Sequence, residues 1–73
     1  MSFKSLFARI PEDQKIDVRD YDAPASNNGI YCGEKQDMSG PIYRSIKSMH
    51  VALIQSQASE IIVYVYGDRA PVR

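Results

Sequence analysis

The chain has 73 residues, which is room for a single domain, and its apolar fraction of 44% is ordinary for a folded protein. Nine basic and nine acidic residues cancel to a formal net charge of zero, so we expect little non-specific attraction to nucleic acid. One cysteine cannot form an internal disulfide, and no apolar run is long enough for a signal peptide or a membrane span. We therefore expect one cytoplasmic domain over residues 1–73 that makes no contact with a membrane.

The first ten residues have the pattern of a short amphipathic helix. Four apolar residues recur at the spacing of one helical face: Phe3, Leu6, Phe7 and Ile10. Ser2 can cap the first amides of this helix, and Pro11 prevents its continuation. Because two phenylalanines on so short a helix need burial, the helix is predicted to cover a core.

A first strand is predicted over residues 15–21, where apolar and polar residues alternate. Ile16 and Val18 would point to one face of a sheet, and Asp17, Arg19 and Tyr21 to the other. The polar residues 22–28 that follow predict a loop.

A second strand is predicted after Asn28 and Gly29, which tolerate the positive φ angles of a turn. Ile30 and Cys32 would share the apolar face of the first strand, whereas Tyr31 and Lys35 would lie on the opposite face. The two strands are expected to pair as an antiparallel hairpin with a long turn.

The extent of a second helix is open from periodicity alone. Ser39, Gly40 and Pro41 predict its start, with a capping side chain and an early proline. Residues 46–55 fit both a helical stripe and the alternation of a strand, since Met49 and Leu53 belong to either pattern.

The closing segment predicts a strand because β-branched and aromatic residues fill it. One face would carry Ile61, Val63 and Val65, and the other Ile62, Tyr64 and Tyr66. Gly67, Asp68 and Pro71 predict its end.

Several stretches, in chain order, carry a resemblance to a known group. They are the Phe/Leu-rich opening helix, IPEDQKIDVRDYD, GIYCGEKQDM and IKSMHVALIQSQASEIIVYVYG. This layout resembles small uncharacterised proteins that phages and mobile elements of Gram-positive bacteria encode. The resemblance implies a closing β-hairpin, with a strand over residues 47–55 and a turn over residues 56–59, and it brings no catalytic residues.

These segments together predict an α+β fold. Its sheet would be antiparallel, with about four strands in two hairpins, packed against the N-terminal helix and a second short helix. A small-molecule pocket between helix and sheet is left open by the sequence.

Two groups of residues raise the question of site chemistry. Five acidic residues crowd the first strand and its flanks, but they lack a calcium-loop spacing and predict a solvated turn: Glu12, Asp13, Asp17, Asp20 and Asp22. Cys32 could meet the only histidine, His50, across the sheet, yet no third group orients the pair. We therefore predict no catalytic residue, no metal site and no cofactor.

The face opposite the predicted core is the best candidate for function. It would carry aromatic and charged side chains, namely Arg19, Tyr21, Tyr31, Lys35, Tyr64 and Tyr66. Tyr and Arg dominate protein interfaces, although tyrosine is also an ordinary strand residue.

Three functions remain in competition. With the resemblance, this face favours a protein-binding module whose partner is a host or phage protein, for example an inhibitor of a host defence or nucleic-acid-processing protein. The alternatives are a single-stranded nucleic-acid binder that stacks bases on these tyrosines, and a structural homodimer that pairs through an edge strand. Zero net charge counts against the nucleic-acid binder.

Overall fold

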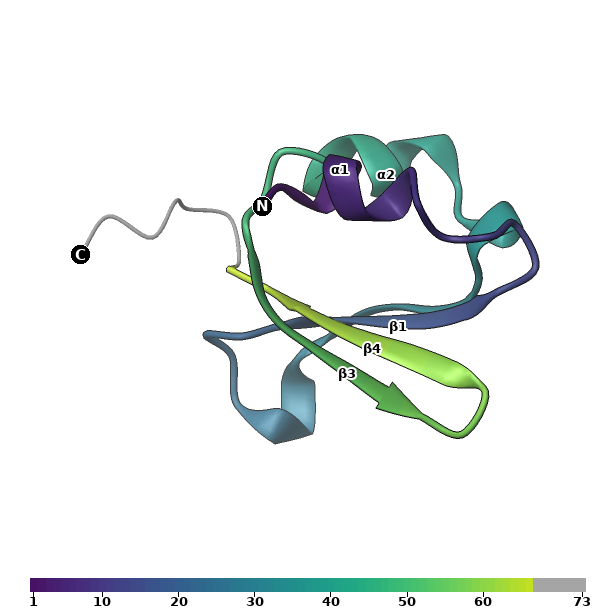
Figure 1. Ribbon diagram of the computed structural model, residues 1–73. Coiled ribbons are helices and arrows are strands. Elements are labelled where there is room, and N and C mark those ends of the chain that lie inside the picture. The colour runs from purple at the N-terminus through teal and green to yellow at the C-terminus, as the bar shows by residue number, and fades with distance from the viewer. Residues whose placement is uncertain (67–73) are drawn as a thin grey trace.

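Four strands and two short helices form the protein in the computed structural model, which describes residues 1–66 (Figure 1). The strands are β1 Lys15–Asp20, β2 Gly29–Glu34, β3 Val51–Gln57 and β4 Glu60–Val65. The helices are α1 Phe3–Phe7 and α2 Gly40–Ile46, and two single 3-10 turns, η1 Ala25–Asn27 and η2 Lys35–Asp37, flank β2. The α+β class predicted from the sequence is confirmed.

The four strands make one mixed sheet in the order β2-β1-β4-β3. Both predicted hairpins are present, because β1 pairs antiparallel with β2 and β3 pairs antiparallel with β4. The central strands β1 and β4 run parallel, so the prediction of a wholly antiparallel sheet is wrong at this one pair. The reason is the path of the chain: after β2 it returns over the sheet as α2, so β3 follows the direction of β2 and β4 that of β1.

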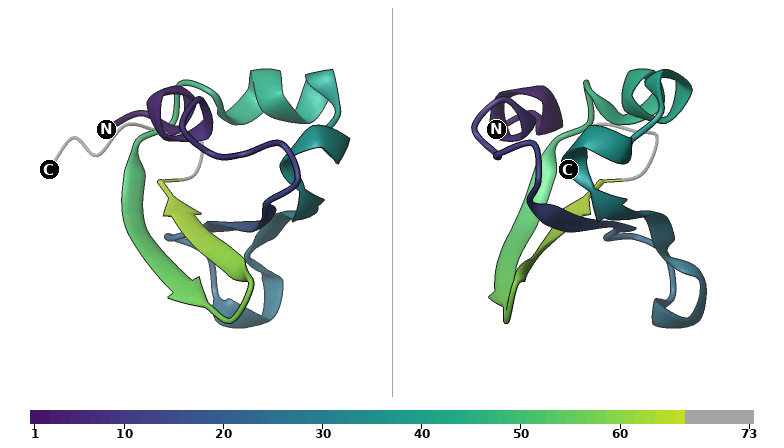
Figure 2. Two further views of the ribbon diagram at one scale, coloured as in Figure 1. Left: turned by 45° about the vertical axis from the view of Figure 1, so that its right-hand side comes forward. Right: turned by 90° about the vertical axis from the view of Figure 1, so that its right-hand side faces the viewer.

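Both helices pack on the same face of the sheet, where the core lies (Figure 2). The buried cluster joins residues from α1, α2 and the two central strands, with Ile10 between them: Phe3, Ile10, Ile16, Val18, Ile46, Val63 and Val65. Ser2 caps α1 as predicted, since its Oγ accepts a hydrogen bond from the amide of Ser5 at 3.3 Å. The helix ends at Phe7, earlier than the apolar spacing indicated, but Ile10 is still buried in the core.

The open question over residues 46–55 has a clear answer. Ser39 caps α2 through a hydrogen bond from the amide of Ile42, and the helix ends at Ile46, whose side chain is buried. The strand reading is confirmed from Val51 onward, and the hairpin turn is the pair Ala58 and Ser59 rather than residues 56–59. A two-residue turn allows β3 to run two residues further than the sequence indicated.

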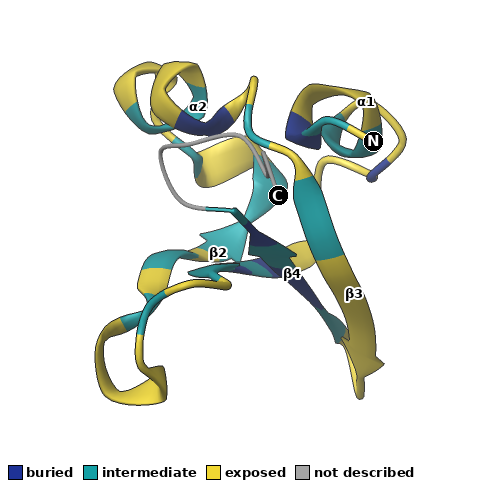
Figure 3. Ribbon diagram, turned by 90° about the vertical axis from the view of Figure 1, so that its left-hand side faces the viewer, coloured by how far each residue is buried: buried dark blue, intermediate teal, exposed yellow. Residues whose placement is uncertain are grey.

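Strand β3 is one edge of the sheet, and Figure 3 shows that its outer half is exposed. The predicted end signals at 67–71 lie outside the described residues. Within residues 1–66, none of the helices has the length and apolar character that crossing a bilayer requires.

Candidate functional site

The sheet face that α1 and α2 leave uncovered is called the open face here. Its residues alternate with the buried residues of each strand. The register places Asp17 beside Ile62, and Arg19 beside Tyr64, in the two central strands. Leu53 of β3 lies on the other side of Tyr64. The open face comprises Lys15, Asp17, Arg19, Tyr21, Cys32, Glu34, Leu53, Gln55, Gln57, Glu60, Ile62, Tyr64 and Tyr66.

Three tyrosines of the predicted surface come together on the open face. The ring of Tyr21, just after β1, lies 5.5 Å from the ring of Tyr66 and 6.3 Å from that of Tyr64, edge-to-face in both cases. This geometry is favourable between aromatic rings. Tyr21 remains 52% exposed, so the cluster presents aromatic surface to a partner.

Arg19 borders this tyrosine cluster and is held by its neighbours. Its Nη2 donates to Oδ2 of Asp17 at 2.8 Å. The hydrogen bond and charge of Asp17 raise the pKa of Arg19 above its ordinary value, with a further contribution from the hydroxyl of Tyr64. The guanidinium is therefore positioned against the sheet, with its charge balanced by a carboxylate on the same face.

Tyr31 does not belong to the open face, which corrects the sequence prediction. It pairs with the fully buried Val18, so its ring turns toward the helices and packs against the core. Its hydroxyl donates to the backbone oxygen of Glu34 at 2.7 Å. Burial is the main cause that raises the pKa of Tyr31 above its ordinary value, and nearby acidic groups add to it.

Lys35 is also absent from the open face, contrary to prediction. It lies in η2, beyond the end of β2, and its Nζ donates to the backbone oxygen of Ile10 at 2.8 Å. The same ammonium sits 4.7 Å from the centre of the Phe7 ring, a cation–π distance. Through these contacts Lys35 holds the end of β2 against α1 and the segment that follows it.

A β-bulge explains why the predicted faces of β2 were wrong. The register shifts between Val18, which pairs with Tyr31, and Arg19, which pairs with Gly29. The extra residue, Ile30, and its neighbour Tyr31 both pack against the core, so simple alternation fails at this point. Cys32, predicted on the core face, is exposed and lies opposite Asp17 on the open face.

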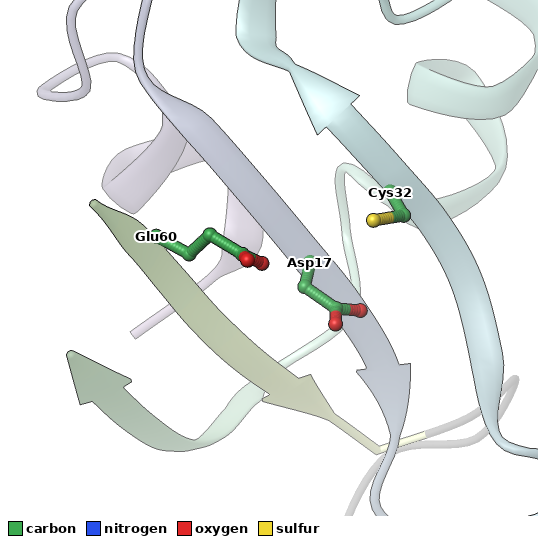
Figure 4. Close-up of side chains that lie close together, drawn as sticks. All are labelled: Asp17, Cys32 and Glu60. Atoms are coloured by element: carbon green, nitrogen blue, oxygen red, sulfur yellow. The ribbon is translucent and has the colours of Figure 1, made fainter. Parts of the chain in front are cut away.

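Three potential metal ligands meet on the open face, one from each of three neighbouring strands (Figure 4). The donor atoms of Asp17, Cys32 and Glu60 all lie within 4.8 Å of one another. Thiolate and carboxylate are ligand types that zinc accepts. However, Arg19 already occupies a carboxylate oxygen of Asp17, so a cation would compete with the guanidinium. Asp17, Cys32 and Glu60 therefore form a polar border of the open face, where Arg19 holds the position that a cation would need.

Of the five acidic residues considered from the sequence, only Asp17 belongs to this three-strand group. The pairing of Cys32 with His50 is also not formed. Cys32 lies on the edge strand β2, whereas His50 immediately precedes β3 at the other edge, about 14 Å away at the usual strand spacing. The backbone of His50 instead forms an isolated antiparallel β-bridge with Ser2.

Two apolar residues of the open face were missed by the sequence analysis. Ile62 is buried although it is not part of the core cluster, and Leu53 is 42% exposed beside Tyr64. The alternation of the closing strand predicts Ile62 on this face, but an aliphatic residue among tyrosines is not a signal of function. Leu53 could have been found from the hairpin. Counting back along both strands from a two-residue turn at 58–59 places Leu53 opposite Tyr64.

No protein-family model, no curated protein and no solved structure matches this chain.

Proposed function

We propose that this protein is a non-enzymatic binding module that engages another protein through its open face. The observation that carries this proposal is the cluster of Tyr21, Tyr64 and Tyr66 on a sheet face that neither helix covers. Tyrosine offers a large contact area and a hydroxyl at low entropic cost, which is why it is enriched in protein interfaces.

The surroundings of the cluster support a protein partner. Leu53 lies beside Tyr64 and extends the aromatic surface with an exposed aliphatic side chain, and the buried Ile62 precedes Tyr64 on this face of β4, between Gln55 and Asp17. Asp17, Arg19 and Glu60 supply charges of both signs at its border. An apolar centre with a polar rim is the usual anatomy of a protein–protein interface.

The same residues count against a single-stranded nucleic-acid binder. Such proteins combine stacking rings with a positively charged groove. Here Asp17 balances the charge of Arg19, and Lys15 lies in register with two carboxylate residues, Glu34 and Glu60.

The identity of the partner remains a proposal that rests on the resemblance. A host or phage protein is the expected class, and inhibition of a defence or nucleic-acid-processing protein is one form of it. The open face supports contact with a protein and does not select among such partners.

Capture from a lysate of the host cell tests the proposal. Tyr21→Ala is the preferred variant, because Tyr21 follows β1 and is half-exposed, so its loss should not unfold the sheet. Arg44→Ala is the control, since Arg44 is exposed on α2, on the other side of the sheet.

We expect one protein to be retained by the wild type and by Arg44→Ala after nuclease treatment, and to be lost with Tyr21→Ala. Retention that disappears with nuclease would favour the nucleic-acid binder instead. Equal retention by both variants would place the binding surface elsewhere.

A further inference from the structure

The edge strand β3 has no strand beside it along most of its length. Only at its first residue is the outer side paired with a described segment, because the amide of Val51 donates to the backbone oxygen of Met1 at 2.8 Å. The preceding residue, His50, forms a backbone β-bridge with Ser2. From residue 52 to residue 57, no other described segment pairs with its outer side. In an antiparallel strand about half of the backbone amide and carbonyl groups point away from the partner, so this stretch offers unpaired hydrogen-bonding groups.

Strand β3 has few of the features that usually protect such an edge, and its bulge lies at its start, between Val51 and Leu53. Its sequence, VALIQSQ, contains neither a charged residue nor a proline. Leu53 and Ile54 are two of the four exposed large apolar residues within residues 1–66, and they are adjacent on this strand. The opposite edge, β2, differs: Gly33 has a φ of +153°, and the strand ends in a charged residue, Glu34.

The side chain of Ile54 has a special place on this edge. Ile54 pairs with Val63, whose side chain is fully buried beneath the helices, so Ile54 points to the helix side of the sheet. It is nevertheless 43% exposed, because β3 is an edge of the sheet and no described strand lies beside Ile54 on the outer side. Ile54 faces the helix side of the sheet but lies at its edge, so another apolar residue beside it would complete its burial.

We propose that β3 pairs antiparallel with β3 of a second copy of this chain, with the two-fold axis at Ile54. Residues opposite each other across antiparallel strands share a face, so a two-fold register must be centred on a residue and not between two. Centring on Ile54 places this side chain against its own copy, and Leu53 against Gln55. Centring on Gln55 instead places Ile54 against Ser56 and leaves it partly exposed.

The second copy is the occupant because the strand complements itself. Leu53 and Gln55, which pair on either side of Ile54, carry no charge, and neither does any other residue of β3, so no like charges oppose each other in the two-fold arrangement. The whole chain also has no net charge that would repel a second copy. Pairing creates one sheet of eight strands and places the two open faces side by side on the same surface. This inference does not depend on the proposed function of the open face.

The oligomeric state of the full chain tests the proposal by sedimentation at increasing protein concentration. We expect the wild type to reach twice the monomer mass, and Ile54→Lys to remain at the monomer mass because two ammonium groups would meet at the axis. Ser26→Lys is the control for the added charge, since Ser26 is exposed in η1, and it should associate like the wild type.

Mixing two variants tests the register. Ile54→Lys and Ile54→Glu should each be monomeric alone, and an equimolar mixture should return to twice the monomer mass. The restored dimer also shows that both variants are folded. A monomeric wild type, association of Ile54→Lys alone, or a mixture that stays monomeric would each overturn the proposal.

Discussion

Gly33 illustrates how a single residue permits the packing of its neighbour. Its φ of +153° is a conformation that side chains rarely adopt, and a Cβ placed there would lie 2.9 Å from the hydroxyl oxygen of Tyr31. The tyrosine ring can therefore turn toward the core only because residue 33 has no side chain.

We predict that Gly33→Ala lowers the free energy of unfolding by about 1–3 kcal/mol, through backbone strain and the contact with Tyr31. Urea denaturation measures this change. Gly29→Ala is the matched control, because a Cβ at Gly29 meets nothing within 4 Å. Equal effects of the two substitutions would contradict the described position of Tyr31.

Tyr31 should also make the stability depend on alkaline pH. Burial raises its pKa above the ordinary value of 10.0, so the unfolded chain loses this proton before the folded protein does. The contribution of Tyr31 to the free energy of unfolding is therefore complete below about pH 10, and it is lost as the pH rises through the pKa of Tyr31 in the folded state.

We predict that Tyr31→Phe weakens the fall in unfolding free energy above pH 10, and that it costs about 1 kcal/mol at neutral pH through the lost hydrogen bond to Glu34. Denaturation curves at neutral and alkaline pH measure both effects. An unchanged slope with pH would place Tyr31 in solvent.

Residue by residue, the alternating pattern predicted the central strands better than the edge strand β2. Ile16, Val18, Val63 and Val65 are buried as expected, because regular pairing on both sides keeps the alternation intact. Tyr31 and its neighbour Cys32 were misplaced because a bulge depends on how the two strands fit together, which a local pattern does not encode.

At the scale of elements, the turn between β3 and β4 carries a strained residue. Ala58 has a φ of 52°, and it is the one residue other than glycine with positive φ in the described part of the chain. The left-handed conformation costs an alanine roughly 1 kcal/mol, whereas glycine adopts it freely.

We therefore predict that Ala58→Gly raises the free energy of unfolding by about 0.5–1 kcal/mol. The control is Ser56→Gly in the regularly paired part of β3, which should lower it by a similar amount because glycine weakens a strand interior. Thermal unfolding of both variants measures the two changes. A loss of stability in Ala58→Gly would show that the turn is not strained.

The elements themselves were predictable where a chemical signal marks their start. Ser2 and Ser39 cap the two helices, as their positions in the sequence indicated. The ends were less predictable, because α1 ends at Phe7, before Pro11, and α2 ends at Ile46 with no glycine or proline directly after it.

For the whole molecule, composition and periodicity predicted the α+β class and both hairpins. They did not predict the parallel pairing of β1 with β4, because that pairing follows from the return of the chain through α2. The candidate surface was predicted in part: Arg19, Tyr21, Tyr64 and Tyr66 converge as expected. Lys35 is held against Phe7 instead, a long-range contact with no local signal.

We propose that the open face binds a protein through the tyrosine cluster. The most direct measurement is the affinity of the captured partner, once purified, for the wild type, Tyr21→Ala and Arg44→Ala. We predict that Tyr21→Ala raises Kd at least about tenfold, and that Arg44→Ala leaves it unchanged. An equal Kd for the wild type and folded Tyr21→Ala would contradict the assignment of the open face as the binding surface.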